Sequence, residues 1–257
     1  MKKLLAVLLA AMMLTAVAAC GKTETKDTAE GEAKSSDTLT MATNAEFKPF
    51  EYVEGDKVVG ADVDIANAIA EKLGKKLEIV NIDFDGALTG AATGKYDVAI
   101  AGITANDDRK ANMNFSDDYY KASQAIIVKA DSDIKAATDL EGKTISCQEG
   151  TTGEQYLNDN NYSVQAYKSG AEAVSALTAG KVDAVVIDNE VAKALSAEQN
   201  GATKVLDEAL TKESYVIALK KGNDELTEQI NKALDELKAD GTLKNIFAKY
   251  DLPVDAE

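Results

Sequence analysis

A repeated helix–strand unit constrains the fold of this chain more than any other feature. From residue 39 on, short apolar runs alternate with amphipathic segments, a pattern typical of α/β proteins. Residues 94–100 (GKYDVAI) recur as residues 180–186 (GKVDAVV), and each copy joins a glycine at a helix end to an apolar strand. We therefore predict two α/β lobes of related topology. Chance similarity between two common units is the alternative.

Apolar runs bounded by turn residues predict the strands of these lobes. They cover residues 39–43, 77–82, 97–101, 125–129, 144–147, 182–187 and 215–219. Apolar residues spaced by four over residues 65–73 predict a helix that ends at Gly74. Two more helices are predicted near the C-terminus, one ending near Gly241 and one stopping before Pro253.

The first 38 residues are interpreted as processing signals rather than fold. Two lysines precede an apolar run over residues 4–19, so residues 1–19 are predicted to be a secretory signal peptide, which is short for a membrane-spanning helix. Small residues directly before Cys20 resemble the lipobox of bacterial lipoproteins, whose cysteine becomes the lipidated N-terminus. An ordinary signal peptide is the alternative. Residues 20–38 then form the lipidated cysteine and a flexible tether without aromatic or large aliphatic side chains.

Charge and residue counts exclude several classes of function. The formal charge of -16 has the wrong sign for a protein that must neutralise nucleic-acid phosphates. The chain has no histidine, which excludes histidine-dependent triads and HExxH zinc sites. Because Cys20 has another role, Cys147 is predicted to be unpaired, so no internal disulfide is expected.

Motifs for metals and cofactors are incomplete in this chain. Residues 81–86 imitate the start of a calcium loop, but Ala92 stands where a bidentate glutamate is required. Both Gly-Lys-Thr tripeptides lack the earlier glycine of a phosphate-binding loop, and no GxGxxG occurs. We expect neither a metal nor a cofactor.

Two matching strand ends, at residues 101–102 and at Asp188, predict the walls of a cleft, because ligands of open α/β sheets bind outside the carboxyl ends of strands. Arg109 follows the first of these strands and is the only arginine among 28 basic residues. Its planar fork matches a carboxylate, which a lysine cannot do. A surface ion pair with Asp107 or Asp108 is the alternative.

Other residues near the predicted strand ends have two interpretations each. Residues 150–153 open a helix, so their N–H groups either face an anion or belong to a plain helix cap. Asp188 suits an ammonium group or caps the next helix. The aromatic rings of Phe47, Phe50 and Phe84 either close a core or stack on a ligand.

Seven segments, taken in order, resemble the polar amino-acid-binding proteins of ABC importers, the extracellular solute-binding proteins of family three. They are residues 42–51 (ATNAEFKPFE), 60–65 (GADVDI), 83–86 (DFDG), 101–104 (AGIT) with Arg109, 114–120 (NFSDDYY), 150–152 (GTT) and 182–188 (VDAVVID). Together they cover essentially everything after the tether.

The resemblance implies a two-lobed, periplasmic-binding-protein-like α/β fold of type II with the ligand in the cleft between the lobes. Lobe 1 is expected at residues 39–118 and 219–257, lobe 2 at residues 124–213, and two hinge strands at residues 119–123 and 214–218. Binding is expected to close the lobes.

The resemblance also implies a set of ligand-binding residues. Arg109, Thr104 and Thr152 are expected to hold the α-carboxylate. Asp188 and the Gly102 carbonyl are expected to hold the α-ammonium, and two aromatic rings to pack on the side chain. The full set is Asn44, Phe47, Phe84, Ala101, Gly102, Thr104, Arg109, Gln148, Thr151, Thr152 and Asp188.

Departures from the family pattern favour a polar uncharged amino acid. Asn44 stands where relatives often carry aspartate, which weakens the case for a cationic ligand. Gln148 stands where glutamine binders can place lysine, so an acidic ligand gains no obvious partner. Glu46 and Glu149 keep a basic amino acid open, and cystine is also open.

The family implies a monomeric, lipid-anchored protein on the outer face of the cytoplasmic membrane that delivers a free polar amino acid to the permease of an ABC importer. Cyclohexadienyl dehydratases and ligand-sensing modules share the fold. An enzyme needs a positioned acid or base beyond what binding requires, and a sensor module is normally fused to a signalling segment. The sequence offers neither, so we expect a binding protein that is not an enzyme.

Overall fold

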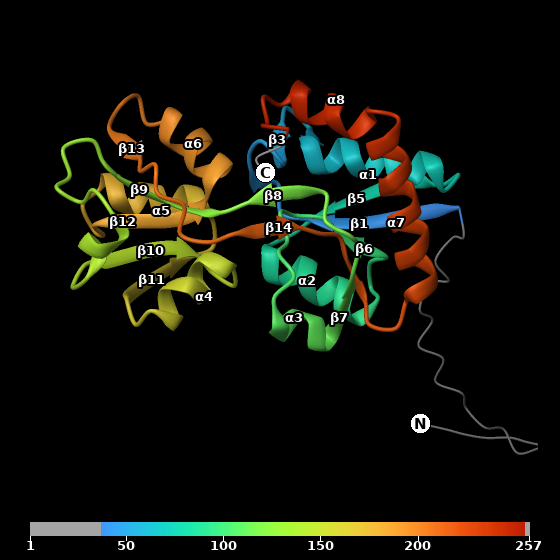
Figure 1. Ribbon diagram of the computed structural model, residues 1–257, viewed down its shortest axis with the longest axis horizontal. Coiled ribbons are helices and arrows are strands. Elements are labelled where there is room, and N and C mark those ends of the chain that lie inside the picture. Colours follow the sequence, from blue (N-terminus) through green and yellow to red (C-terminus); the bar gives the residue numbers. More distant parts are fainter. Residues whose placement is uncertain (1–36, 255–257) are drawn as a thin grey trace, which may run out of the picture. The chain divides into compact units, whose positions relative to one another are not determined.

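Two separate five-stranded sheets carry the fold in the computed structural model, which describes residues 37–254 (Figure 1). The sheet of lobe 1 has the order β5 (Lys76–Asn81), β1 (Thr38–Thr43), β6 (Val98–Ala99), β15 (Ala218–Lys220) and β7 (Met113–Phe115). The sheet of lobe 2 has the order β11 (Ser163–Tyr167), β10 (Thr144–Gln148), β12 (Ala184–Asp188), β9 (Gln124–Lys129) and β13 (Thr203–Val205). The predicted signal peptide, Cys20 and most of the predicted tether lie outside the described residues.

The two sheets share one pattern of strand directions. In each, the first three strands are parallel, and the last two are antiparallel to their neighbours. The repeated sequence unit runs into β6 in lobe 1 and into β12 in lobe 2, which are the third strands of their sheets. The repeat therefore reflects related lobes, and it places Gly102 and Asp188, each two residues past its copy, in equivalent positions.

Helices connect and cover these strands. They are α1 (Ala61–Lys72), α2 (Phe84–Thr93), α3 (Asp107–Asn112), a short 3-10 helix (Ala137–Leu140), α4 (Thr152–Asp159), α5 (Gly170–Thr178), α6 (Asn189–Ala197), α7 (Asp224–Ala239) and α8 (Thr242–Lys249). As its apolar spacing predicts, α1 buries Ile65 and Ile69, and the chain turns at Gly74 with a φ of 66°. Helices α7 and α8 return to pack against α1 in lobe 1.

A small antiparallel sheet precedes α1. It consists of β2 (Glu46–Phe47), β3 (Glu51–Glu54) and β4 (Lys57–Val59). At its end the chain comes very close to Phe50: a Cβ at Gly60 would lie 2.1 Å from the Phe50 backbone oxygen. Only a glycine fits there, so this contact fixes β3 against the start of α1.

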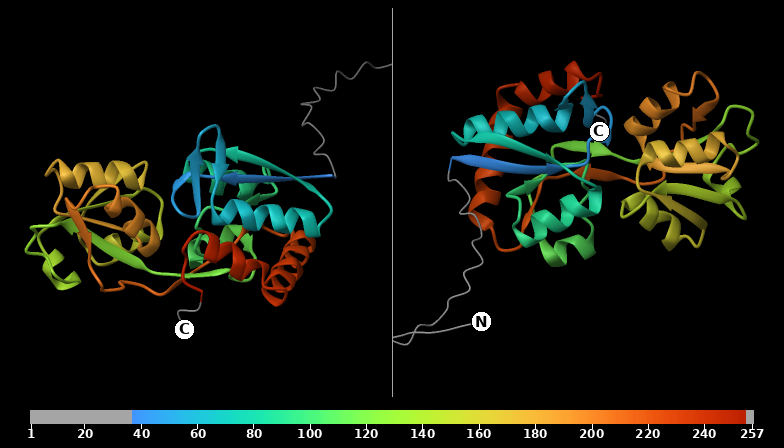
Figure 2. Two further views of the ribbon diagram at one scale, coloured as in Figure 1. Left: turned by 90° about the horizontal axis from the view of Figure 1, so that it is seen from above. Right: turned by 180° about the vertical axis from the view of Figure 1, so that it is seen from behind.

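Two strands carry the chain between the lobes. β8 (Tyr120–Ala122) leads into lobe 2, β14 (Glu213–Tyr215) leads back, and the two pair in antiparallel register. Figure 2 shows the green and orange segments running side by side between the two sheets. Tyr120 and Tyr215 each place their ring 5.0 Å from the ring of Phe50, which anchors both connecting strands on lobe 1.

Two predicted strands differ from those observed. The run at 97–101 forms only the two-residue strand β6, because the chain turns at Gly102 with a φ of 55°. The run at 215–219 is divided between β14 and β15: the Val216 N–H donates to Ile103, and the Ile217 N–H donates to the Ser116 hydroxyl. One apolar run thus belongs to two sheets, which apolarity alone does not reveal.

Within residues 37–254, none of the helices combines the length and apolar character needed to cross a membrane.

Candidate functional site

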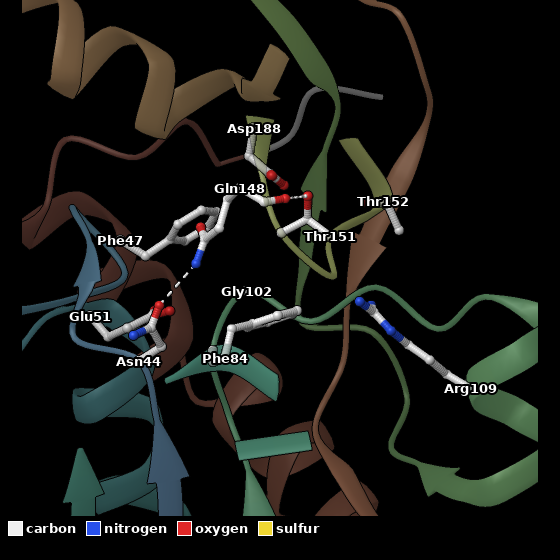
Figure 3. Close-up of a pocket in the computed structure, with 11 residues that line it drawn as sticks. Asn44, Phe47, Glu51, Phe84, Gly102, Arg109, Gln148, Thr151, Thr152 and Asp188 are labelled. Carbon is white, nitrogen blue, oxygen red and sulfur yellow. Dashed lines mark hydrogen bonds between the residues drawn. The ribbon is translucent and has the colours of Figure 1, made fainter. Parts of the chain in front are cut away.

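A small pocket lies where the two lobes meet (Figure 3). It is lined by Asn44, Phe47, Glu51, Phe84, Ala101, Gly102 and Arg109 from lobe 1 and by Gln148, Thr151, Thr152 and Asp188 from lobe 2. The structure thus brings together all the residues predicted for the site except Thr104, and it adds Glu51. The open space is about 10 Å³, roughly what one water molecule requires, so the pocket in this arrangement is too small for an amino acid.

Arg109 connects the two lobes at one end of this pocket. Its Nη1 donates to the backbone oxygen of Thr104 in lobe 1 at 2.7 Å, and its Nη2 donates to the backbone oxygen of Gly150 in lobe 2 at 2.9 Å. The guanidinium lies 5.4 Å from the centre of the Phe84 ring. A planar fork with several donors makes this arrangement possible.

The surface ion pair considered for Arg109 is wrong. Within the described chain neither adjacent aspartate pairs with it, and Asp107 lies 3.6 Å from Lys110 instead. Burial lowers the pKa of Arg109, and the carboxylate of Glu213 is the first of the charges that oppose this shift. The guanidinium is therefore a half-buried cation whose charge is partly balanced by nearby carboxylates.

Asp188 presents a buried carboxylate at the end of β12. The Tyr215 hydroxyl donates to its Oδ1 at 2.6 Å, and Gln124 Nε2 donates to its Oδ2 at 2.9 Å. Asp188 holds the N-cap position of α6, but its side chain makes no capping hydrogen bond, so the capping interpretation is wrong for the carboxylate. Burial first, and then the charge of Glu213, raise the pKa of Asp188 to about 7.

The first turn of α4 closes the lobe 2 side of the pocket. The Thr151 hydroxyl accepts from the Glu154 N–H at 3.3 Å and donates to the backbone oxygen of Gln148 at 2.7 Å. The capping interpretation is therefore right for Thr151. The N–H groups of this turn have no partner within the helix, which leaves them suited to an anion.

The hydroxyls of Thr104 and Thr152 do not point their hydrogens at the pocket. Both donate to the same oxygen, Glu213 Oε2, at 2.8 Å each. A hydroxyl has only one hydrogen to donate, so in this arrangement neither side chain donates to a ligand carboxylate. This differs from the role that the family resemblance implies, because nothing in the local sequence indicated where Glu213 lies.

Two amides close the opposite end of the pocket. Gln148 Nε2 donates to Asn44 Oδ1 at 3.0 Å across the lobes, and Asn44 Nδ2 donates to the backbone oxygen of Ile82 at 3.2 Å. Figure 3 shows this pair at the end away from Arg109, with Phe47 beside it and the Phe84 ring between the pair and Arg109. The amides therefore face the part of the pocket that a ligand side chain would reach.

Glu51 is the site residue that the sequence analysis missed. It is completely buried, and neither carboxyl oxygen accepts a hydrogen bond from a donor among residues 37–254; its close polar neighbour is the carboxyl of Asp62, to which a protonated Glu51 can donate. Burial first, and then the charge of Asp62, raise the pKa of Glu51 well above its ordinary value. A carboxyl group inside the apolar run Pro49-Phe50-Glu51-Tyr52 was the one local signal that could have indicated it.

Asp62 and Gly102 shape the wall beside Glu51. Asp62 accepts from the Gly102 N–H at 2.9 Å and from the Tyr119 hydroxyl at 2.8 Å, and burial raises its pKa to about 6. A Cβ at Gly102 would lie 2.7 Å from Phe47 Cε1. The glycine therefore lets the ring and the turn share one wall of the pocket.

No metal centre accompanies this pocket in the part of the chain that the structure describes, where no cluster of three or more His, Cys, Asp or Glu side chains is placed to hold an ion. Cys147 is buried in lobe 2 as a free thiol, and burial followed by the charge of Glu154 raises its pKa to about 12. The thiol is therefore unreactive at neutral pH.

Two related α/β lobes, joined by two strands around a small polar pocket, define the class of two-lobed periplasmic binding proteins. Residues 39–253 match the family of bacterial extracellular solute-binding proteins, family 3, and the chain belongs to that family.

Relatives of the chain bind amino acids. It is 33% identical to the arginine-binding extracellular protein ArtP of Bacillus subtilis (strain 168), over 97% of this chain and 98% of that protein. An ancestral arginine-binding protein, solved with glutamine and with arginine, is 44% identical with a TM-score of 0.79, over 83% of this chain and 97% or 98% of the solved chain. An ancestral amino acid-binding protein described as a precursor of cyclohexadienyl dehydratase is 34% identical with a TM-score of 0.77, over 83% of this chain and 95% of that chain.

Proposed function

We propose that this protein captures a polar amino acid outside the cytoplasm and delivers it to the permease of an ABC importer. One observation carries the proposal: a half-buried guanidinium and a buried carboxylate, contributed by different lobes, line a single small pocket. The α-carboxylate and α-ammonium groups of a free amino acid complement this pair. The family consists of extracellular solute-binding proteins and includes an arginine-binding relative.

The amino-acid backbone is proposed to bind at the end that holds Arg109. Arg109 and the first-turn N–H groups of α4 take the α-carboxylate. Asp188 and the Gly102 carbonyl take the α-ammonium, while Phe47 and Phe84 pack on the aliphatic part of the side chain. Ala101, Thr151 and Thr152 complete the walls.

We infer that the ligand side chain ends in N–H donors. A guanidinium is preferred over an amide. Glu51 supports this choice, because its buried carboxyl has a second carboxyl, Asp62, as its neighbour and no donor among the described residues, and a ligand N–H would supply that donor. The positive charge of a guanidinium also stabilises the ionised form of the Glu51 carboxyl, whereas an amide only forms hydrogen bonds with it. This moves the preference from uncharged side chains toward basic ones, in keeping with relatives that bind arginine.

A thermal unfolding screen tests the proposal. The chain from residue 21 on, stripped of ligand by unfolding and refolding, is heated with each common amino acid, ornithine, citrulline or cystine. At about 100 times its dissociation constant a ligand stabilises by roughly 2.7 kcal/mol, which shifts the midpoint visibly. We expect the largest shift with L-arginine. No shift with any amino acid, from a folded protein, would overturn the assignment.

We further propose that β8 and β14 act as hinge strands between lobes bounded as the sequence predicts, and that the protein is a monomer anchored by a lipid on Cys20. The 10 Å³ pocket supports a hinge, because a ligand must open it to enter. Labelling of cells with a palmitate analogue tests the anchor: wild type is expected to incorporate the label and Cys20→Ala is not.

Dehydratase activity is the second candidate, favoured by the likeness to a precursor of cyclohexadienyl dehydratase. Burial raises the pKa of Glu51, which gives the pocket a carboxyl that holds its proton more firmly than an ordinary glutamate and could serve as an acid. We propose that it serves ligand recognition instead, because the relatives themselves are binding proteins. Turnover of prephenate or arogenate, measured spectrophotometrically, decides between the two.

A further inference from the structure

Glu213 lies on a connecting strand, outside the pocket lining, and contacts both lobes. Its Oε2 accepts hydrogen bonds from Thr104 in lobe 1 and from Thr152 in lobe 2, at 2.8 Å each. Its Oε1 accepts from the Thr211 hydroxyl at 2.7 Å. Among the described residues, this carboxylate therefore accepts its hydrogen bonds from threonine hydroxyls, and one of its oxygen atoms is shared between the two lobes.

Glu213 Oε2 can accept both hydrogen bonds only while the lobes are together. Thr104 follows β6, and Thr152 begins α4 on the facing lobe. When the lobes separate, one oxygen atom cannot stay within hydrogen-bond distance of both hydroxyls. Opening the cleft therefore breaks at least one charge-assisted hydrogen bond, a stronger type than bonds between neutral groups.

The bridge also sets the orientation of groups next to the ligand. Because Thr152 donates its hydrogen to Glu213, it has a lone pair free to accept from Gln124 Nε2 at 3.3 Å. The same Gln124 nitrogen donates to Asp188 at 2.9 Å. A chain of hydrogen bonds thus leads from the connecting strand to the carboxylate proposed to hold the ammonium.

Arg109 makes a second connection between the same two regions. It bonds the backbone oxygen of Thr104 on one lobe and that of Gly150 on the other, two residues before Thr152. The negative charge of Glu213 attracts this guanidinium. The two connections share Thr104 on one lobe and use residues two positions apart, Gly150 and Thr152, on the other, so we expect them to form and break together.

We propose that Glu213 is a positioning residue that stabilises the closed arrangement of the lobes and thereby sets the affinity for the ligand, a role that rests on the proposed function. A ligand enters while the lobes are apart and is held once they close, so the bridge stabilises the complex relative to the open protein and its loss weakens binding. Glu213 raises affinity without contacting the ligand, and its loss acts mainly on the dissociation rate.

Small-angle X-ray scattering of the ligand-free chain from residue 21 on tests the bridge without any ligand. Glu213→Ala is expected to increase the radius of gyration, because more molecules are open. Glu213→Gln, whose amide oxygen still accepts from both threonines, is expected to stay close to wild type. An unchanged radius of gyration for Glu213→Ala would overturn the proposal.

Titration calorimetry and stopped-flow dissociation with L-arginine test the effect on binding. Glu213→Ala is expected to raise the Kd about tenfold through faster dissociation, with Glu213→Gln between it and wild type. Glu208→Ala is the control, because the Glu208 carboxylate bonds only the Ala137 N–H within lobe 2. Tighter binding by Glu213→Ala would mean that Glu213 competes with the ligand and would overturn the proposal.

Two threonine variants keep the test decisive if Glu213→Ala does not fold. Thr104→Val and Thr152→Val each remove one arm of the bridge, and the double variant is expected to lose little more than either single one. Additive losses would contradict a shared oxygen. If wild type binds no L-arginine, the proposed function is in doubt, while the scattering experiment still decides the role of Glu213.

Discussion

The two ends of the pocket differ in how far the protein satisfies its own polar groups. Arg109 at one end and Asp188 on the lobe 2 wall each have two hydrogen bonds with the protein. At the other end Glu51 is completely buried and accepts none from a donor among the described residues, and its neighbour is a second carboxyl, Asp62.

This difference separates two tasks of the site. A preorganised end holds the groups that every amino acid has, and it costs little to arrange when a ligand arrives. An end with a buried carboxyl that has no hydrogen-bond donor favours a ligand whose side chain supplies that donor. Selection by ligand side chain is therefore strong at this end. We therefore expect affinity to depend most on the first end and selectivity on the second.

Loss of Arg109 is expected to have the largest effect. Arg109→Ala should weaken L-arginine binding by more than about 100-fold, because it removes the cation for the α-carboxylate and one connection between the lobes. Arg109→Lys should recover little, since a lysine lacks the planar fork. Titration calorimetry measures this, with Lys110→Ala on the exposed side of α3 as control. Near-normal binding by Arg109→Ala would remove the distinction between the two ends.

Replacement of Glu51 should change the affinity for L-arginine relative to that for L-glutamine. Glu51→Gln is expected to weaken L-arginine binding about 30-fold and to change L-glutamine binding by less than about threefold, because only the guanidinium needs the negative charge. Competition calorimetry with both ligands gives the ratio. Glu46→Gln, an exposed glutamate on neighbouring β2, should leave the ratio unchanged. Equal losses for both ligands would show that Glu51 does not select by charge.

The pH dependence of binding should report Asp188. Its pKa in the free protein is raised to about 7, and an ammonium partner favours the ionised form, so binding releases a proton below that pH. Affinity should therefore fall by at most about tenfold per pH unit below 7 and level off above it. Calorimetry from pH 5.5 to 8.5 measures the slope.

Neighbouring acids must be separated from this slope. Burial raises the pKa of Asp62 to about 6, and it raises the pKa of its neighbour Glu51, which lines the pocket, well above the ordinary value. Asp188→Asn should remove most of the slope, whereas Glu51→Gln should keep the part below pH 7. A slope that survives in Asp188→Asn would assign the proton to the other end of the pocket.

Loss of the amide pair should have the smallest effect. Asn44→Ala removes one neutral hydrogen bond to Gln148 and opens the far end of the pocket, so we expect about a threefold loss for L-arginine. Longer ligands such as cystine should bind better relative to L-arginine. Thermal unfolding with both ligands shows the direction, and Gln148→Ala should match it. A loss as large as that of Glu51→Gln would place selectivity in the amides instead.

Much of the fold and site follows from local pattern. The alternation of apolar strands and amphipathic helices, and the repeat ending at Ala101 and Asp188, predict two lobes with facing strand ends because periodicity is a property of neighbouring residues. The lone Arg109 is visible as a chemical exception in a lysine-rich chain. The division of residues 215–219 between two sheets is not visible, since the same apolar residues suit either.

The sequence by itself determined the elements, their order and the charged pair that defines the pocket, because these depend on residue type and spacing. Tertiary structure alone decided that Glu51 is buried without a hydrogen-bond donor and that Glu213 joins Thr104 to Thr152. Hydrogen-bond partners and burial depend on what distant segments bring to one place: Glu213 meets Thr104 from more than 100 positions away. The sequence determines which residues carry a carboxylate, but the surroundings of each carboxylate are set only when the lobes come together.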